Sequence, residues 1–331
     1  MLSYLNIKSK GFVSVLSRNM KSTVVIVLVI VVAFVLNLIS NGRFLQISNL
    51  LSLLQYACYP ALLTWGMSFI FTAGIIDLSL GANILLSANI GAICAVQFGL
   101  GYPGLILGTI LSCVILEHLS MRCSQSLKLP SWIAGLGIAL IFEAVLGIYS
   151  VNYSKKNAAA TITLPPELRF FGTLEGAIVL LVVGGIAAYI IFNHTTIGIN
   201  VRAIGIDENV SASMGINKTK TVFLGALAGA IFIGLASIRQ ISYASSLMAQ
   251  TGLNSISVIV NGLAAFLLAS SFSFMASMPV SIFFSSFFVV SIFNLLTMFK
   301  FQSGSAQQVF LGLIVILCGI MSQFGKKGVI K

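Results

Sequence analysis

The sequence Gly74-Ile-Ile-Asp-Leu-Ser-Leu-Gly81 lies between two strongly apolar runs of the chain. An ionised carboxylate such as Asp77 costs about 2.5–3.5 kcal/mol at the centre of a membrane helix. The same carboxylate is tolerated at a helix start, where free backbone N–H groups and the helix dipole favour it. Asp77 therefore predicts either an N-cap that simply starts the next helix, or a helix break near a solute path.

The composition places this stretch in a membrane. The 331 residues are 58% hydrophobic and only 8% charged, whereas soluble domains carry about 25% charged residues. Apolar surface in this proportion has to face lipid or other buried helices. We expect an all-α, polytopic integral membrane protein.

About ten apolar runs are long enough to serve as transmembrane helices. They form a single transmembrane domain over residues 1–331, and the first is expected to stay attached because no cleavage site for a signal peptide follows it. The predicted spans are Ser22–Leu38, Leu51–Phe71, Leu78–Gln97, Tyr102–Ser120, Ser131–Ser150, Leu174–Phe192, Thr221–Ile238, Gly252–Ser270, Met275–Thr297 and Gln307–Gln323.

Ten spans put both termini on the same side, and the basic residues indicate which side it is. With the termini in the cytoplasm, 12 of the 18 Lys and Arg residues fall inside and 6 outside, as the positive-inside rule expects. The six on the outside are Arg43, Lys155, Lys156, Arg169, Arg239 and Lys300. The net charge of +11 therefore reflects membrane topology rather than nucleic-acid binding.

The longest predicted cytoplasmic loop contains a short amphipathic helix. Asp207 and Glu208 suit its first turn, and Gly215 suits its end. The residues Ile206, Val210 and Met214 are spaced four apart and form one apolar stripe. Two turns of helix are not stable alone, so we expect this helix to lie on the membrane surface or to dock on a cytoplasmic partner.

At these two stretches the chain resembles the permease family of ribose-type solute importers, which also includes branched-chain amino acid permeases. The family has a segment similar to Gly74–Gly81 after its second span, and a cytoplasmic segment similar to this one. The residues that carry the second similarity are Ala203, Gly205, Asn209, Ala212, Gly215 and Ile216.

The resemblance implies a bundle like that of type II ATP-binding cassette (ABC) importers, in the bacterial inner (plasma) membrane. It also implies three partners: a cytoplasmic ABC ATPase, a periplasmic or lipid-anchored solute-binding protein, and a second permease copy or paralogue. The residues expected to couple the chain to the ATPase are Gly205, Asp207, Glu208, Val210, Ala212 and Gly215.

Polar residues within the apolar runs are candidates for the solute path, because they usually face the bundle interior or a wet cavity. We expect the path near Asp77, Ser79, Asn89 and Asn261. Neutral amides can bind a hydroxyl-rich solute without fixing a charge, but each could equally form an interhelical hydrogen bond. We expect no metal site, since the adjacent Glu117 and His118 point about 100° apart on a helix.

Together these features predict the permease subunit of an ABC importer that moves a small polar solute, most simply a ribose-like monosaccharide. The chain has no phosphate-binding loop sequence of its own, so we expect no enzyme and no cofactor, with ATP bound and hydrolysed by a partner. The alternatives are an importer of this class for nucleosides or another small solute, and an ion-coupled secondary transporter. The latter would need a second broken helix to match Asp77.

Overall fold

The computed structural model describes residues 34, 37–38, 40–127, 129–157, 159–272, 276–300 and 304–326. These residues form helices and connecting loops, and no strand occurs among them. The long helices are α2 (Ile47–Phe71), α3 (Leu80–Ala92), α4 (Gly101–Leu127), α5 (Ser131–Ser154), α6 (Leu174–His194), α9 (Lys218–Ala244), α10 (Ile256–Ser271), α11 (Met278–Met298) and α12 (Ser305–Lys326). A π-helical turn, η1 (Ile93–Gln97), continues α3. The short helices α7 (Thr196–Ile206) and α8 (Glu208–Ser213) lie between α6 and α9.

The helix pattern confirms the predicted class of fold. Nine of the ten predicted spans coincide with these long helices, while the first, Ser22–Leu38, lies almost wholly outside the described residues. In the part of the chain that the structure describes, six helical segments are both long and apolar enough to cross a membrane. The chain is therefore a multi-pass, all-helical membrane protein.

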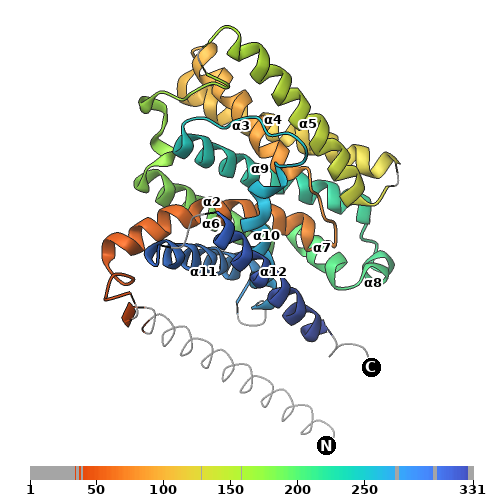
Figure 1. Cartoon of the computed structure of the whole chain (residues 1–331). Coiled ribbons are helices and arrows are strands. Elements are labelled where there is room, and N and C mark those ends of the chain that lie inside the picture. The colour runs from red at the N-terminus through yellow and green to blue at the C-terminus, as the bar shows by residue number, and fades with distance from the viewer. Residues whose placement is uncertain are drawn as a thin grey trace, which may run out of the picture.

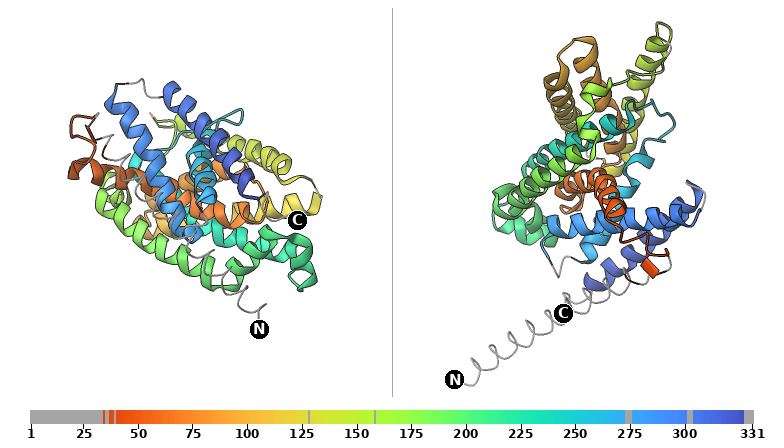
Figure 2. Two further views of the ribbon diagram at one scale, coloured as in Figure 1. Left: turned by 90° about the horizontal axis from the view of Figure 1, so that it is seen from below. Right: turned by 90° about the vertical axis from the view of Figure 1, so that its left-hand side faces the viewer.

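The bundle has two sides joined by a central pair of helices (Figures 1 and 2). Helices α3, α4 and α5 form one side, and α6, α10, α11 and α12 form the other. Between them, α9 packs on α3 and α4, and α2 packs on α6, α10 and α11. The short helices α7 and α8 project from one end of the bundle (Figure 1).

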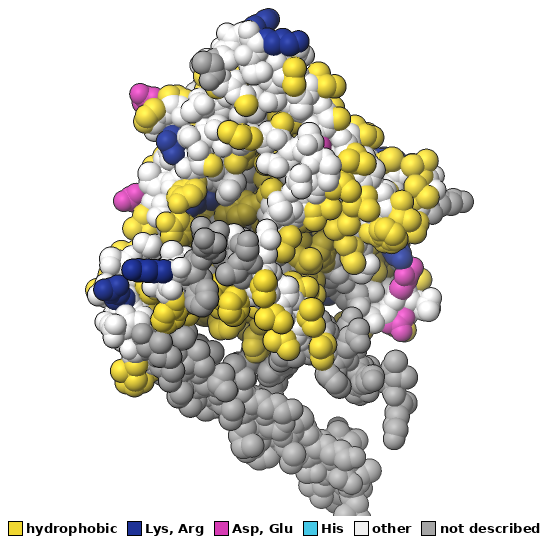
Figure 3. Space-filling view, viewed as in Figure 1, with side chains coloured by type: hydrophobic (Ala, Val, Ile, Leu, Met, Phe, Trp, Pro, Cys, Tyr) yellow, Lys and Arg dark blue, Asp and Glu magenta, His cyan; other side chains and the backbone are white. Residues whose placement is uncertain are grey.

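Large apolar side chains are exposed over much of the bundle. On the face shown in Figure 3, hydrophobic side chains cover much of the middle, and charged side chains lie mainly toward the edges. Many large apolar side chains on α4, α5 and α6 are exposed, such as Leu111, Ile148 and Val183. Helices that are apolar on their outer faces are suited to contact with lipid.

Small residues allow the two central helices to approach closely. A methyl group built on Gly229 of α9 would lie 2.5 Å from the carbonyl oxygen of Gly66 on α2, and one on Gly66 would lie 2.7 Å from the carbonyl oxygen of Gly229. Contacts this short leave no room for a side chain on either helix. The close approach places α2 in the core, where every residue from Pro60 to Ile70 is buried.

One basic residue is not where the charge count put it. Arg239 lies within α9 rather than in an outside loop, and only 2% of its surface is exposed. Its Nη2 donates to the carbonyl oxygen of Gln55 at 3.0 Å, and its guanidinium lies 4.7 Å from the centre of the Tyr243 ring. Arg239 is therefore a residue of the bundle interior and does not belong in a count of loop charges.

We predict that Gly229→Ala destabilises the bundle, because the added methyl group overpacks the contact between α2 and α9. Overpacking costs about 1–3 kcal/mol, so the thermal unfolding midpoint of the purified chain in detergent should fall. The matched control is Gly147→Ala on α5, where an added methyl group meets nothing within 4 Å. Equal midpoints for the two variants would contradict the assigned role of Gly229.

Candidate functional site

The helix α8 forms as the sequence predicts, because its first turn is capped. Oδ1 of Asp207 accepts hydrogen bonds from the backbone N–H groups of Asn209 (2.9 Å) and Val210 (3.0 Å). These are the free donors that a helix start leaves unsatisfied. The chain leaves α8 at Gly215, whose φ of +83° favours glycine.

The structure interrupts the predicted stripe: Ile206 ends α7, the extended backbone of Asp207 follows, and Met214 lies just past the end of α8. We keep the name stripe for Ile206, Val210 and Met214, whose side chains are all exposed. Ile206 is 86% exposed, Val210 55% and Met214 75%. Glu208 forms an exposed ion pair with Lys218 on α9, whose Nζ lies 2.6 Å from Oε2; such a pair contributes at most about 1 kcal/mol. A short helix with an exposed apolar stripe beside it is suited to docking on another protein.

The neighbouring helix α7 connects this stripe to the interior. Gly205 of α7 lies directly against the carbonyl group of Thr72, and a side chain at this position would collide with it. Thr72 follows the last residue of α2 and opens the segment that leads to Asp77. Gly205 therefore joins α7 to the segment that precedes α3.

Asp77 is buried in this segment and does not act as the N-cap of the next helix. The helix α3 begins at Leu80, after Ser79, and no side chain caps it. One oxygen of Asp77 accepts from the N–H of Ser79 at 2.7 Å, and the other accepts from the hydroxyl of Ser120 on α4 at 2.8 Å. The expectation of a cap was wrong, because the carboxylate of Asp77 accepts from the N–H of Ser79, which precedes α3, and from the hydroxyl of Ser120 on α4.

A second irregular segment runs between α9 and α10; Leu247 and Ser255 are its buried residues, whereas Met248, Thr251, Gly252 and Asn254 are exposed. Its carbonyl at Leu247 accepts from Asn89, whereas its carbonyl at Ser255 lies against Gly81. The two α3 residues are eight positions apart, or about 12 Å along a helix. The segment therefore descends about half the depth of the bundle before α10 starts.

The start of α10 is held by a carboxylate on another helix. Oε1 of Glu143 on α5 accepts from the N–H of Ser255 at 2.9 Å, and Oε2 accepts from the N–H of Leu253 at 3.0 Å. From there α10 runs alongside the second half of α2: Tyr59 donates to the carbonyl of Val258, and Thr64 donates to that of Gly262. Non-helical backbone at this depth is tolerated only where protein satisfies it.

The structure separates the four residues expected near the solute path. Asp77 and Ser79 belong to the closed network with Ser120. Asn89 is buried, and its Nδ2 donates to the carbonyls of Leu85 (2.9 Å) and Leu247 (3.0 Å). Asn261 is half-buried on α10.

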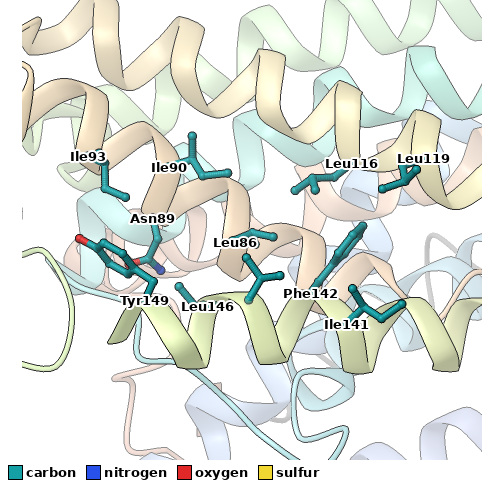
Figure 4. Close-up of a pocket in the computed structure, with 11 residues that line it drawn as sticks. Leu86, Asn89, Ile90, Ile93, Leu116, Leu119, Ile141, Phe142, Leu146 and Tyr149 are labelled. Carbon is teal, nitrogen blue, oxygen red and sulfur yellow. The ribbon is translucent and has the colours of Figure 1, made fainter. Parts of the chain in front are cut away.

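Asn89 also lines a cavity of about 410 Å³ between α3, α4 and α5 (Figure 4). Apart from Asn89 and Tyr149, the side chains around it are apolar, including Leu86, Ile141 and Phe142. An apolar lining is unsuited to a hydroxyl-rich solute. This cavity is therefore not a sugar path in the conformation described.

Several polar residues with structural roles were not assigned those roles from the sequence. Asn83, Glu117 and Ser120 join Asp77 in the interior, and Glu143 supports α10. Each was visible as a polar residue in an apolar run, but its partner lies 34–112 positions away. Within the described ranges, no group of three or more His, Cys, Asp or Glu residues could hold a metal ion.

The chain is similar to known membrane permeases. A family model described as "Branched-chain amino acid transport system / permease component" matches residues 49–319. Among curated proteins, the xylose transport system permease protein XylH of Escherichia coli (strain K12) is 29% identical over 138 residues. That alignment covers 42% of this chain but only 35% of the xylose permease.

Longer alignments link the chain to other permeases. The ribose import permease protein RbsC of Escherichia coli (strain K12) is 24% identical over 262 residues, or 73% of this chain and 77% of that protein. The fructose import permease protein FruG of Bifidobacterium longum (strain NCC 2705) is 22% identical over 240 residues, or 69% of each. No solved structure matches the chain significantly.

We predict that Glu143→Ala destabilises the start of α10, because it leaves the N–H groups of Leu253 and Ser255 without an acceptor. Each buried donor that loses its partner costs about 1–3 kcal/mol. Hydrogen exchange of residues 250–258 should become faster, and the unfolding midpoint should fall.

Two further variants control for the loss of charge. Glu143→Gln keeps one acceptor oxygen and should have an intermediate effect, whereas Glu175→Ala, at an exposed carboxylate in the first turn of α6, should leave residues 250–258 unchanged. Unaltered exchange in Glu143→Ala would show that Glu143 does not hold this segment.

Proposed function

Because the chain belongs to the family described as branched-chain amino acid transport system / permease component, we propose that it is the membrane subunit of an ABC importer. The relatives are named as permeases for xylose, ribose and fructose, and we extend this substrate class to the chain: its solute is a monosaccharide. The alignment spans only 35% of the xylose permease, so the solute and the partners are part of the proposal.

The observation that carries the proposal is the exposed apolar stripe of α8. A membrane subunit that hydrolyses no ATP needs a rigid contact through which a separate ATPase can move it. The stripe of Ile206, Val210 and Met214 offers apolar area, the Asp207 cap starts α8, and the Glu208–Lys218 ion pair links α8 to α9. We place α8 in the cytoplasm against the ATPase, with both termini on that side of the bacterial plasma membrane.

Coupling to the interior follows from the contacts of α7. A shift of α8 moves Gly205 against Thr72, and so moves residues 72–79 together with the Asp77–Ser120 bond to α4. Of the six coupling residues, Asp207, Glu208 and Gly215 shape the helix, Val210 and Ala212 lie exposed on it, and Gly205 makes the contact with Thr72. Rigid-body movement of this kind is the usual way in which a packed bundle changes access.

The remaining partners follow from the same family. A binding protein on the outer side would deliver the solute, and a second permease copy or paralogue would complete the path. Of the path candidates, we favour Asn261, since its half-buried amide can hydrogen-bond a sugar hydroxyl. Asp77, Ser79 and Asn89 are bound within the chain and would reach the solute only after a rearrangement.

One observation favours an ion-coupled secondary transporter as the second candidate. Such proteins bind ions at discontinuous helices in both halves of the chain. The first half has the break at Asp77, and the second half has the irregular segment that Glu143 holds before α10. Because each half has one break, this alternative is tested by asking whether uptake depends on ATP or on an ion gradient.

We predict that Val210→Asp uncouples transport, because a charge in the stripe opposes burial against an apolar partner surface. Sugar uptake in cells that express the complete importer should fall at least about tenfold, the effect of losing about 1.4 kcal/mol, while the amount of membrane-inserted chain stays normal. Asn209→Asp introduces the same charge beside the stripe and should retain most uptake. Wild-type uptake in Val210→Asp would exclude the stripe as the docking surface.

We predict that Asn261→Leu and Asn89→Leu fail in different ways. Asn261→Leu should lower uptake while leaving the yield of folded chain unchanged, because its amide serves the solute. Asn89→Leu should lower the yield, because the carbonyls of Leu85 and Leu247 lose their buried donor. Size-exclusion chromatography and uptake kinetics separate the two; unchanged kinetics in Asn261→Leu would remove this residue from the path.

A further inference from the structure

A cluster of buried polar side chains joins α3 to α4 next to the Asp77 segment. Asp77 and Ser79 come from the segment before α3, and Asn83 comes from α3 itself. Glu117 and Ser120 come from α4. None of the five is more than 2% exposed. Buried polar groups usually find partners, so any that lack one point to a missing component.

Each oxygen of Asp77 has a hydrogen-bond donor. Its two oxygens accept from the N–H of Ser79 and the hydroxyl of Ser120. Ser120 has a single hydroxyl proton, which it gives to Asp77. The 3.0 Å contact between the Ser79 and Ser120 hydroxyls is then a bond donated by Ser79.

Glu117 and Asn83, in contrast, each keep one unsatisfied oxygen. Nδ2 of Asn83 donates to Oε2 of Glu117 at 3.2 Å and to the carbonyl of Cys113 at 3.3 Å. Oε1 of Glu117 and Oδ1 of Asn83 are both buried and have no donor. Two buried acceptors, on side chains that already share one hydrogen bond, therefore lack a donor.

No basic side chain compensates a second negative charge here. The ion pair between Glu208 and Lys218 is the one salt bridge among the described residues. On α9, the stretch facing this part of α4 lies between Phe223, which contacts His118, and Gly234, which contacts Cys113. This stretch, Leu224–Ile233, contains no titratable residue.

The remaining titratable groups around Glu117 are accounted for as well. On its own helix these are Cys113, His118 and Arg122, whose exposed guanidinium lies over the ring of Phe223. The segment before α3 gives Asp77, and on α5 the nearest is Glu143, which is bound to the backbone ahead of α10. An ionised Glu117 beside an ionised Asp77 would be a buried, unpaired charge, which is strongly destabilising.

We propose that Glu117 binds a proton, so that Glu117 and Asn83 form an acid–amide pair with two hydrogen bonds. The proton comes from water and resides on Oε1, from which it is donated to Oδ1 of Asn83. A carboxylic acid and a primary amide each offer one donor and one acceptor side by side, so a single proton satisfies both orphaned oxygens. It also leaves Asp77 as the only charge in the cluster.

The site gives the bundle a contact between α3 and α4 that depends on protonation. It lies one helical turn from Ser120, which binds the segment that α7 contacts. A movement that separates α3 from α4 would break the pair and expose the acid to water, where it loses its proton. This inference does not rest on the nature of the solute or of the energy source.

Infrared difference spectroscopy of the full-length chain in detergent at neutral pH tests the proposal. The spectrum of the wild type minus that of Glu117→Gln should contain the carbonyl stretch of a protonated carboxylic acid. The same band should be retained in Glu175→Gln, which changes an exposed carboxylate. If the difference spectrum contains only ionised carboxylate bands, the proposal is overturned.

Thermal unfolding gives a second measurement that does not depend on spectral assignment. Glu117→Gln keeps one donor and one acceptor and should unfold within a degree or so of the wild type, whereas Glu117→Ala should lose several degrees. A bound metal cation would give the opposite pattern. In that case sodium or potassium chloride, compared with choline chloride, would stabilise the wild type, and Glu117→Gln would lose this effect, which would also overturn the proposal.

Discussion

The two hydrogen bonds that Glu143 accepts from the backbone just ahead of α10 set a condition on which the second half of the bundle depends. A chain inside a membrane has no water to satisfy free N–H groups, so a helix can begin at mid-depth only if protein supplies an acceptor. Glu143 supplies both acceptor oxygens from α5, at 2.9 and 3.0 Å. In the first half, the Asp77 carboxylate does the same for Ser79, ahead of α3. At both interruptions of the helical backbone, a carboxylate therefore accepts hydrogen bonds from the free N–H groups.

The two interruptions also lie beside each other, and one of them is connected to the exposed helix α8. Gly81, at the start of α3, touches the carbonyl of Ser255, at the start of α10. Gly205 of α7 touches Thr72, which opens the segment before α3. A displacement of α8 thus has a continuous path of close contacts into the centre of the bundle. The closely packed crossing of α2 and α9 at Gly66 and Gly229 gives that movement a rigid frame.

The sequence was sufficient for the features that depend on local pattern. Hydropathy located the spans, and the order Asp207, Glu208 and Gly215 located α8, because capping acts within a few residues. Features that depend on pairs distant in the sequence were not predictable. Glu143 and Ser255 are 112 positions apart, and Arg239 and Gln55 are 184 apart. For the same reason α10 starts at Ile256 rather than Gly252: the backbone at Leu253 and Ser255 is bound to α5 and is not free to form a helical turn.

The central claim is that a separate cytoplasmic protein, which hydrolyses ATP, drives movement of this bundle through α8. The most direct measurement is sugar uptake into proteoliposomes that contain the chain with or without its ATPase and binding protein. Uptake should require both partners and ATP, and should survive ionophores that collapse sodium and proton gradients. Uptake by the chain alone under an imposed ion gradient, with no nucleotide present, would contradict the claim and establish a secondary transporter instead.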